Sequence, residues 1–325
     1  MRRLALIFLL GLCGCGASVA SVDSQAISPS FALDQATHRP ENGLTVRVYN
    51  TGSLVVRGGA VSSRKSWTSK TRLDIPAFLI KHPKQGYVLF DTGLHPDMAV
   101  DPGKRMGRLN HFFLPFETKR RQDVVSQLAA DGISAEQVRW VVISHLHIDH
   151  VGMIDAFPQA TVLVDRREWQ AQKEKQAKKR DQRELDPEAL EGKIHLRLVE
   201  LSSAPSYGAF DHGVDLFHDG TLFLVDVAGH SPGTMGLWAS LDEGPVFLAG
   251  DASWVLDNHR DLAMPLTFRI FSTLQYQRRL RQMKSLQEAV PRLVIFPGHD
   301  LQPLTLQPRR DISLALFPRG ADMED

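Results

Sequence analysis

The sequence predicts an α/β fold of four layers, in which two β-sheets pack face to face and helices cover their outer faces. Short apolar runs typical of strands alternate with helical patterns along most of the 325 residues. A turn, an apolar strand and a terminal aspartate occur at 86–91 and again at 244–251, which indicates an internal duplication. No linker separates the two halves, and two packed sheets with helices outside would bury both faces of every strand.

The expected strands are short apolar runs rich in β-branched residues, most of them followed by a glycine, a proline or a polar residue. In chain order they are 44–49, 53–57, 73–80, 87–91, 140–143, 161–164, 222–225, 235–238, 245–248 and 293–296. The expected helices have apolar residues at helical spacing. They are 122–130, 166–179 and 272–289. Residues 103–121 are expected to form a loop that carries one dense apolar cluster.

Composition excludes several classes of protein. The chain has 38 Lys and Arg against 37 Asp and Glu, a formal net charge of +1, so it lacks the basic excess of a dedicated nucleic-acid-binding protein. Its two cysteines, Cys13 and Cys15, both lie near the N-terminus. A disulfide scaffold, a zinc finger and a cysteine-ligated metal core are therefore excluded.

The N-terminus has the pattern of a bacterial export signal. Arg2 and Arg3 precede an apolar run that is shorter than the ~20 residues needed to cross a bilayer. Two cleavage sites remain open. Residues 12–15 resemble a lipobox, which would leave a lipidated Cys15 as a membrane anchor, whereas Ala20 ends a sequence of small residues that suits an ordinary signal peptidase.

These features divide the chain into a leader (1–20), a flexible tether rich in Ser, Ala, Gln, Pro and Thr (21–42) and one domain (43–325). The mature protein is expected in the periplasm, or anchored to the outer membrane as a lipoprotein. The sequence does not indicate its oligomeric state.

The chemistry is concentrated just after the strand at 140–143. In an extended segment, residues two apart point to the same side, so His145 and His147 can converge on one ion. Asp149 and His150 follow directly and are expected to face a second position close by.

Three more candidate ligands follow apolar strands and are flanked by glycine or proline. They are His230, Asp251 and His299. Loops at strand ends present side chains on a rigid scaffold. Five histidines and two aspartates without a thiolate suit Zn²⁺ or another first-row divalent ion.

The order of these residues resembles the metallo-β-lactamase superfamily over about residues 44–302. The segments that carry the resemblance look most like those of N-acyl homoserine lactone lactonases, and they are 144–150, 229–233, 251–253 and 296–300. The resemblance implies the metallo-β-lactamase fold, a four-layer αββα sandwich with internal duplication, for the metallo-hydrolase domain at 43–325.

The same resemblance implies two divalent metal ions, expected to be Zn²⁺. The first would be held by three imidazoles, those of His145, His147 and His230. The second would be held by Asp149, His150 and His299, with Asp251 bridging the two.

Two further residues are singled out by comparison with the family's pattern. Asp91, in Phe90-Asp91-Thr92-Gly93, resembles the family's first motif, in which the carboxylate supports the metal site, although a turn-capping aspartate would give the same pattern. Trp254 stands where the lactonases usually have tyrosine. An indole N–H can only donate a hydrogen bond, so Trp254 would orient a carbonyl or line an acyl pocket.

Two cations that share a hydroxide keep it deprotonated near neutral pH. The expected function is therefore a dinuclear metal-dependent hydrolase that opens a lactone ring like that of an N-acyl homoserine lactone. The shared hydroxide would attack the carbonyl of this small-molecule substrate, a lactone or ester. The candidate catalytic residues are Asp251, Trp254 and Asp149, the last as a proton carrier. The apolar segments 112–116 and 268–271 would either wall an acyl pocket or pack in the core.

Two alternatives remain. The same site could hydrolyse a thioester, as in glyoxalase II-like members, a β-lactam or a phosphoester, although dizinc β-lactamases usually have cysteine in place of Asp251. The chain could instead be a non-catalytic metal-binding lipoprotein of the envelope. The complete ligand set argues against this second alternative.

Overall fold

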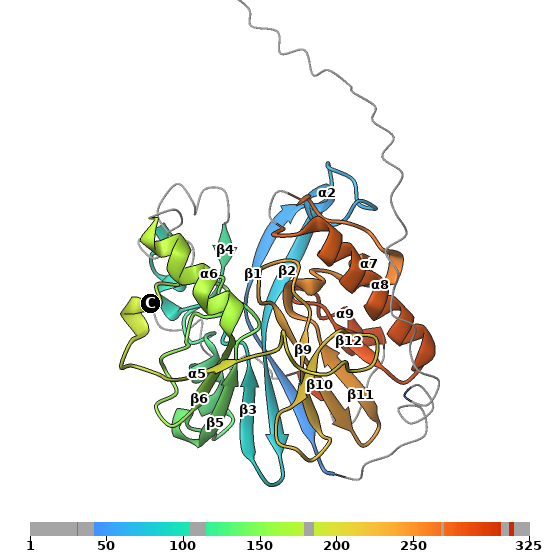
Figure 1. Ribbon diagram of the computed structural model, residues 1–325. Helices are drawn as coiled ribbons and strands as arrows, with labels where there is room; N and C mark the ends of the chain where they lie inside the picture. The colour runs from blue at the N-terminus through green and yellow to red at the C-terminus, as the bar shows by residue number, and fades with distance from the viewer. Residues whose placement is uncertain are drawn as a thin grey trace, which may run out of the picture.

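The computed structural model describes residues 31, 42–103, 115–178, 185–267, 270–306 and 312–314. Over these residues two β-sheets pack against each other and helices cover their outer faces (Figure 1). The predicted four-layer α/β sandwich is confirmed.

The first sheet has eight strands in the order β13-β1-β2-β3-β5-β6-β7, with β4 paired to β1. Their bounds are β1 Thr45–Arg57, β2 Lys70–His82, β3 Gly86–Phe90, β4 Phe116–Glu117, β5 Val138–Val142, β6 Thr161–Asp165, β7 His195–Val199 and β13 Ile312–Leu314. The second sheet has five strands in the order β12-β11-β10-β9-β8. Their bounds are β8 Gly213–Asp215, β9 Leu222–Asp226, β10 Met235–Leu241, β11 Gly244–Leu248 and β12 Val294–Phe296.

Six α-helices lie among the described residues. They are α2 Gly58–Val61, α5 Val124–Ala130, α6 Arg166–Ala177, α7 Leu256–Asp261, α8 Thr273–Ala289 and α9 Gln302–Leu306. The three helices predicted from apolar spacing correspond to α5, α6 and α8 within two residues at each end.

The core forms four apolar clusters, and three of them are the layers that four packed layers require. The layer between the sheets contains Phe78 and Leu237. A second layer, which contains Leu128 of α5 and Trp169 of α6, covers the outer face of the first sheet. A third, which contains Leu280 of α8, covers the outer face of the second sheet.

The two halves repeat one pattern of strand pairing. β2 pairs antiparallel with β3, which pairs parallel with β5. In the same way, β10 pairs antiparallel with β11, which pairs parallel with β12. Asp91 follows β3 and Asp251 follows β11, so the duplicated sequence pattern lies at equivalent places in the two sheets.

Two predicted strands are in fact one. The segments at 44–49 and 53–57 were expected to be separate, but β1 runs through both and is irregular where it pairs with β2 between Asn50 and Ser53. Within this irregular stretch, the hydroxyl of Thr51 donates a hydrogen bond to the backbone carbonyl of Ile75 at 2.8 Å. A β-bulge has the sequence pattern of a turn but keeps the strand continuous. The edge strands β7, β8 and β13 were not predicted, because they are short and only partly apolar.

The expected leader, with Cys13 and Cys15, lies outside the described residues. Within the expected tether, Phe31 packs against Tyr207 and Trp238, with ring centroids 5.3 and 6.0 Å apart. Asn42 donates through its side chain to the carbonyl of Ser240 at 2.7 Å. Both residues therefore contact the second sheet. No helix among the described residues is long and apolar enough to cross a membrane.

Candidate functional site

The predicted ligands lie in four loops, and each loop follows the carboxyl end of a strand. His145, His147, Asp149 and His150 follow β5, His230 follows β9, Asp251 follows β11, and His299 follows β12. The two sheets thus bring residues from 145 to 299 to one place.

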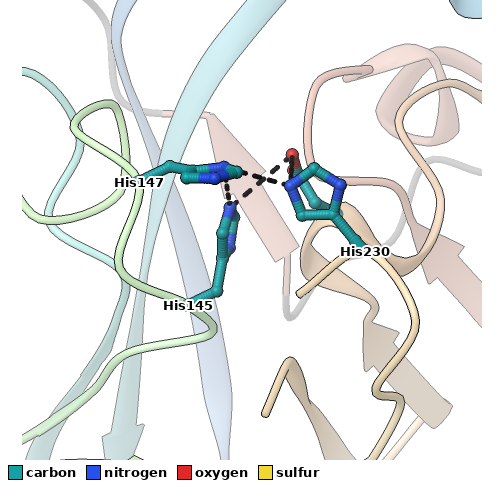
Figure 2. Close-up of side chains that lie close together, drawn as sticks. His145, His147 and His230 are labelled. Atoms are coloured by element: carbon teal, nitrogen blue, oxygen red, sulfur yellow. Dashed lines mark hydrogen bonds and ion pairs between the residues drawn. The ribbon is translucent and has the colours of Figure 1, made fainter. Parts of the chain in front are cut away.

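Four side chains form the first cluster. Nδ1 of His147 lies 2.9 Å from Nε2 of His145 and 3.0 Å from Nε2 of His230. Oδ2 of Asp251 lies 3.7 and 3.3 Å from the Nε2 atoms of His145 and His230. The three imidazoles point toward one another in Figure 2, and all four ligand atoms lie within 4.8 Å of one another.

The second cluster consists of Asp149, His150 and His299. Oδ2 of Asp149 lies 3.9 Å from Nε2 of His150 and 3.7 Å from Nε2 of His299. Oδ1 of Asp251 lies 3.4 and 3.1 Å from the same two nitrogens. One oxygen of Asp251 therefore faces each cluster, which is the geometry of a bridging carboxylate.

Buried polar atoms indicate that cations fit here. Nε2 of His150 and Oδ1 of Asp251 are buried and have no hydrogen-bond partner among the described residues. A buried polar atom without a partner is costly, and a cation bound to these lone pairs removes the cost. With nitrogen and carboxylate donors in two sets, the residues fit two divalent ions.

The protonation of these groups follows from burial and from neighbouring charges. Burial lowers the pKa of His230 to about 3 and the pKa of His145 well below its usual value, so both imidazoles keep a free lone pair. Burial would raise the pKa of Asp251, but the imidazoles of His299, His150 and the first cluster outweigh it, so this pKa lies well below its usual value. The side chain of Asp251 is therefore already ionised before it binds a cation.

Asp91 fixes the orientation of His150. Its Oδ2 accepts from Nδ1 of His150 at 2.8 Å, so Nε2 faces the second cluster. Its Oδ1 accepts from the backbone N–H of Ser144 at 2.7 Å, directly before the first ligand. The residue has a φ of +59°, a left-handed conformation that few residues other than glycine adopt. These contacts favour a supporting role over simple turn capping.

Asp91→Asn is expected to weaken metal binding by about 10- to 100-fold, because the amide nitrogen would face either Nδ1–H of His150 together with the Ser144 hydroxyl or, in the flipped orientation, the backbone N–H of Ser144. Titration of metal-free protein with Zn²⁺ measures the effect. Asp155→Asn, at an exposed aspartate in the same loop region, is the matched control. Equal affinities for the two variants would contradict the role assigned to Asp91.

Glu168 of α6 was missed by the sequence analysis. Its carboxylate is buried and accepts from the backbone N–H of Leu146 at 3.1 Å and of Gly233 at 3.0 Å. It also accepts from the hydroxyl of Ser231 at 2.6 Å. Glu168 thus joins the two loops that supply the imidazoles of the first cluster. It lies in a charged helical segment, where nothing in the sequence distinguishes it from exposed glutamates.

Trp254 lies beside the first cluster. Its ring centroid is 5.6 Å from that of His230, and the side chain is largely buried. Its indole Nε1 is buried and has no hydrogen-bond partner among the described residues. Trp254 therefore lies at the site, and its indole N–H donates no hydrogen bond to a described residue.

His259 of α7 supports the loop after Asp251. The imidazole is buried, and its Nδ1 lies 3.0 Å from the hydroxyl of Ser253. Burial lowers the pKa of His259 to about 3, whereas an unfolded histidine titrates near 6.5. Below pH 6.5 the unfolded chain therefore binds more protons at this position, so stability decreases as the pH falls toward 3.

His259→Asn keeps a polar atom near Ser253 but does not titrate. Between about pH 6 and pH 4 we expect its free energy of unfolding to decrease less steeply than that of the wild type, by up to ~1.4 kcal/mol per pH unit. Urea unfolding at several pH values measures the slope. His195→Asn, at an exposed histidine, is expected to follow the wild type. Parallel curves for all three proteins would contradict the prediction.

A cleft of about 1080 Å³ opens over the two clusters. Five of the predicted ligands line it: His147, Asp149, His230, Asp251 and His299. Its other walls are largely apolar and include Leu54, Trp67 and Leu266. Of the segments expected to wall an acyl pocket, Pro115, Phe116, Ile270 and Phe271 line this cleft. Residues 112–114, 268 and 269 lie outside the described residues.

Known proteins share this sequence pattern and fold. An N-acyl homoserine lactonase AttM of Azorhizobium caulinodans is 30% identical over 263 residues, which cover 78% of this chain and 93% of the relative. The N-acyl homoserine lactonase AiiA of Bacillus thuringiensis subsp. kurstaki is 28% identical over 261 residues, which cover 77% of this chain and 91% of the relative. Among solved structures, an N-acyl homoserine lactone hydrolase with N-hexanoyl-L-homoserine at its catalytic metal centre superposes with a TM-score of 0.63 and 20% identity, over 81% of this chain and 95% of the other.

The family model of the metallo-β-lactamase superfamily matches residues 71–299, a range that contains all seven predicted ligands. Together with the fold and the relatives, this match shows that the chain belongs to the metallo-β-lactamase superfamily.

Proposed function

We propose that this protein is a dinuclear metal-dependent hydrolase that opens the ring of N-acyl homoserine lactones. The observation that carries the proposal is Asp251, whose two oxygens face two separate clusters at the base of one large cleft. The curated relatives that cover most of this chain have lactonase names. Such a reaction would inactivate acylated lactone signals, which is known as quorum quenching.

Two divalent ions, which we propose to be Zn²⁺, would supply Lewis acidity and a water molecule of lowered pKa. The protein's side chains would hold the two ions and transfer a proton. His145, His147 and His230 would hold the first ion, and Asp149, His150 and His299 the second, with Asp251 shared. Asp149 has a side chain that is 14% exposed and lines the cleft, so it could accept the proton that the newly formed carboxylic acid releases and pass it to the alkoxide that leaves when the ring opens.

The walls of the cleft would bind the acyl chain. Leu54, Phe116 and Ile270 offer apolar surface in the cleft that also contains the two clusters of ligand side chains. Burial of apolar surface favours acylated substrates by roughly 0.8 kcal/mol for each buried CH₂ group. Longer acyl chains should therefore bind more tightly until the cleft is filled.

A panel of substrates tests the proposal with metal-free and Zn²⁺-reloaded protein. We expect hydrolysis of acyl homoserine lactones by the reloaded protein, with little turnover of a thioester, of nitrocefin or of a phosphodiester. Turnover of the thioester with inert lactones would overturn the lactonase proposal and favour the glyoxalase II-like alternative. Binding of two ions with no turnover of any compound would favour the non-catalytic alternative.

Trp254→Phe removes the indole N–H while keeping an aromatic wall. We expect kcat/KM for a lactone to fall by about tenfold, as for the loss of one hydrogen bond of ~1.4 kcal/mol, with the metal content unchanged. Trp254→Tyr, which restores a donor, should recover part of the activity. If Trp254→Phe were as active as the wild type, Nε1 would not bind substrate.

We also propose that the protein is exported, either to the periplasm or to the outer membrane through a lipidated Cys15. The support is the leader pattern at residues 1–20. The intact mass of the protein purified from a bacterial host decides between the two sites, because cleavage before Cys15 adds lipid and cleavage after Ala20 does not.

A further inference from the structure

One segment at the mouth of the cleft is strongly basic. Residues 57–72, here called the basic loop, comprise the last residue of β1, the connection to β2 and the first residues of β2, and they contain five Lys or Arg and no Asp or Glu. Trp67 lies in the middle of this segment and is 57% exposed. It is one of five large apolar side chains that are exposed among the described residues.

The basic loop is held in place, so the exposure of Trp67 is a fixed feature. The backbone N–H groups of Gly58 and Gly59 donate to the carbonyls of Ser69 and Ser66 at 2.9 and 3.2 Å. The Trp67 ring lies so close to Gly59 that a Cβ there would be 2.7 Å from it. The N–H of Leu266 donates to the carbonyl of Ala60 at 3.0 Å and fastens the loop to the body.

A second exposed aromatic side chain completes the rim. Phe271 is 64% exposed, and it lines the same cleft as Trp67. Its backbone N–H donates to the carbonyl of His230 at 3.0 Å, so its position is tied to the metal site. Leu274, in the first turn of α8, is 60% exposed. In Figure 1, α2 marks the position of the basic loop at one end of the molecule.

The charges around this rim are mainly positive. Lys65 lies 3.8 Å from Asp257 and Arg72 lies 3.5 Å from Asp74, so these two cations have acidic neighbours. Arg57 and Lys70 line the cleft, and their side chains form no ion pair with a described residue. Glu117 is the exposed acidic residue on the cleft wall and offsets one of these charges.

We propose that the basic loop and Phe271 form an interfacial surface that binds an anionic phospholipid bilayer. Exposed aromatic side chains surrounded by Lys and Arg suit the headgroup region, where the rings enter the interface and the cations meet lipid phosphates. Trp67 and Phe271 would lie at headgroup depth, with Arg57, Arg64 and Lys70 facing the anionic surface. The mouth of the cleft would then open toward the membrane, where molecules with acyl chains accumulate.

A fluorescent label tests the depth of the loop directly. The full chain with Cys13→Ser and Cys15→Ser carries no lipid and no native thiol, so Ser66→Cys beside Trp67 can be labelled selectively with a polarity-sensitive dye. We expect its emission to shift to the blue with vesicles that contain phosphatidylglycerol and to stay unchanged with pure phosphatidylcholine. Lys84→Cys, in the exposed turn at the far end of β2, is the matched label and should not shift.

Vesicle sedimentation tests the residues. Because each basic side chain near an anionic surface contributes about a fivefold change in binding, Arg64→Gln with Lys70→Gln should lower the partition coefficient by roughly 25-fold. Trp67→Ser should also lower it, and Lys84→Gln should not. Every variant keeps the same N-terminal residues, so differences between their partition coefficients measure the contribution of the basic loop.

Equal sedimentation of all these variants, or a label at residue 66 that does not respond to anionic vesicles, would overturn the proposal. Variants that change only the KM for long-chain lactones would show that the rim binds substrate and no bilayer. The label and sedimentation experiments use no substrate, so failure of the lactonase proposal and failure of this one are distinguishable.

Discussion

Asp251→Ala is expected to lower the rate of hydrolysis by roughly a thousandfold, equivalent to about 4 kcal/mol, and to prevent the binding of two ions together. The reason is geometric. Oδ2 of Asp251 lies 3.3 Å from Nε2 of His230, and Oδ1 lies 3.1 Å from Nε2 of His299. No other described carboxylate lies in contact with both clusters, so its loss removes a ligand from each.

Elemental analysis and a lactone assay on the same sample measure both effects. We expect at most one ion per chain after extensive dialysis against Zn²⁺ and removal of the free ion. Asp155→Ala, at an exposed aspartate, should keep two ions and full activity. Asp251→Ala with two ions per chain and normal turnover would contradict the bridging role.

The ligand loops could be located from the sequence because each follows a short, strongly apolar strand. Val141, Phe247 and Ile295 are buried, and the residues after their strands project the ligands at the sheet edge. The order of these residues carries the resemblance to the metallo-β-lactamase superfamily, and that resemblance predicted the fold and implied the grouping of the ligands. The structure adds which oxygen of Asp251 faces which cluster.

Other parts of the site could not be predicted, because they depend on contacts between distant residues. The carbonyl of Asp74 accepts from Nδ1 of His299 at 2.8 Å across 225 positions of sequence. Nothing in the local pattern at Asp74, on a strand of the first sheet, indicates a contact with a ligand of the second. His259 likewise stands in an ordinary helical pattern, and only its burial shows that it supports the loop of Asp251.

Close packing around two glycines also could not be predicted from the sequence. A Cβ on Gly298 would lie 2.4 Å from Oδ1 of Asp251, and a Cβ on Gly233 would lie 2.5 Å from the backbone nitrogen of Glu168. Both glycines flank ligands and were interpreted only as turn residues. They allow the backbone to approach the carboxylates that organise the centre.

Glu168→Ala is expected to have the largest effect on stability, because it removes the acceptor that joins the two loops of the first cluster. The N–H groups of Leu146 and Gly233 would be left buried without a partner, which costs about 1–3 kcal/mol for each. The Ser231 hydroxyl keeps a contact of 2.7 Å with the Thr234 hydroxyl and is less affected. We therefore expect a loss of about 3–5 kcal/mol in the free energy of unfolding.

A stability loss alone would not establish a role at the metal site, so the test includes metal affinity at a temperature where the variant is folded. We expect the first ion to bind at least about tenfold more weakly, since His145 and His230 are no longer held in one arrangement. Glu174→Ala, at an exposed position of the same helix, should change stability by less than about 0.5 kcal/mol and leave affinity unchanged. Glu168→Gln keeps one accepting oxygen and should fall between the two. A destabilised Glu168→Ala with wild-type metal affinity would show that Glu168 supports the fold without positioning the ligands.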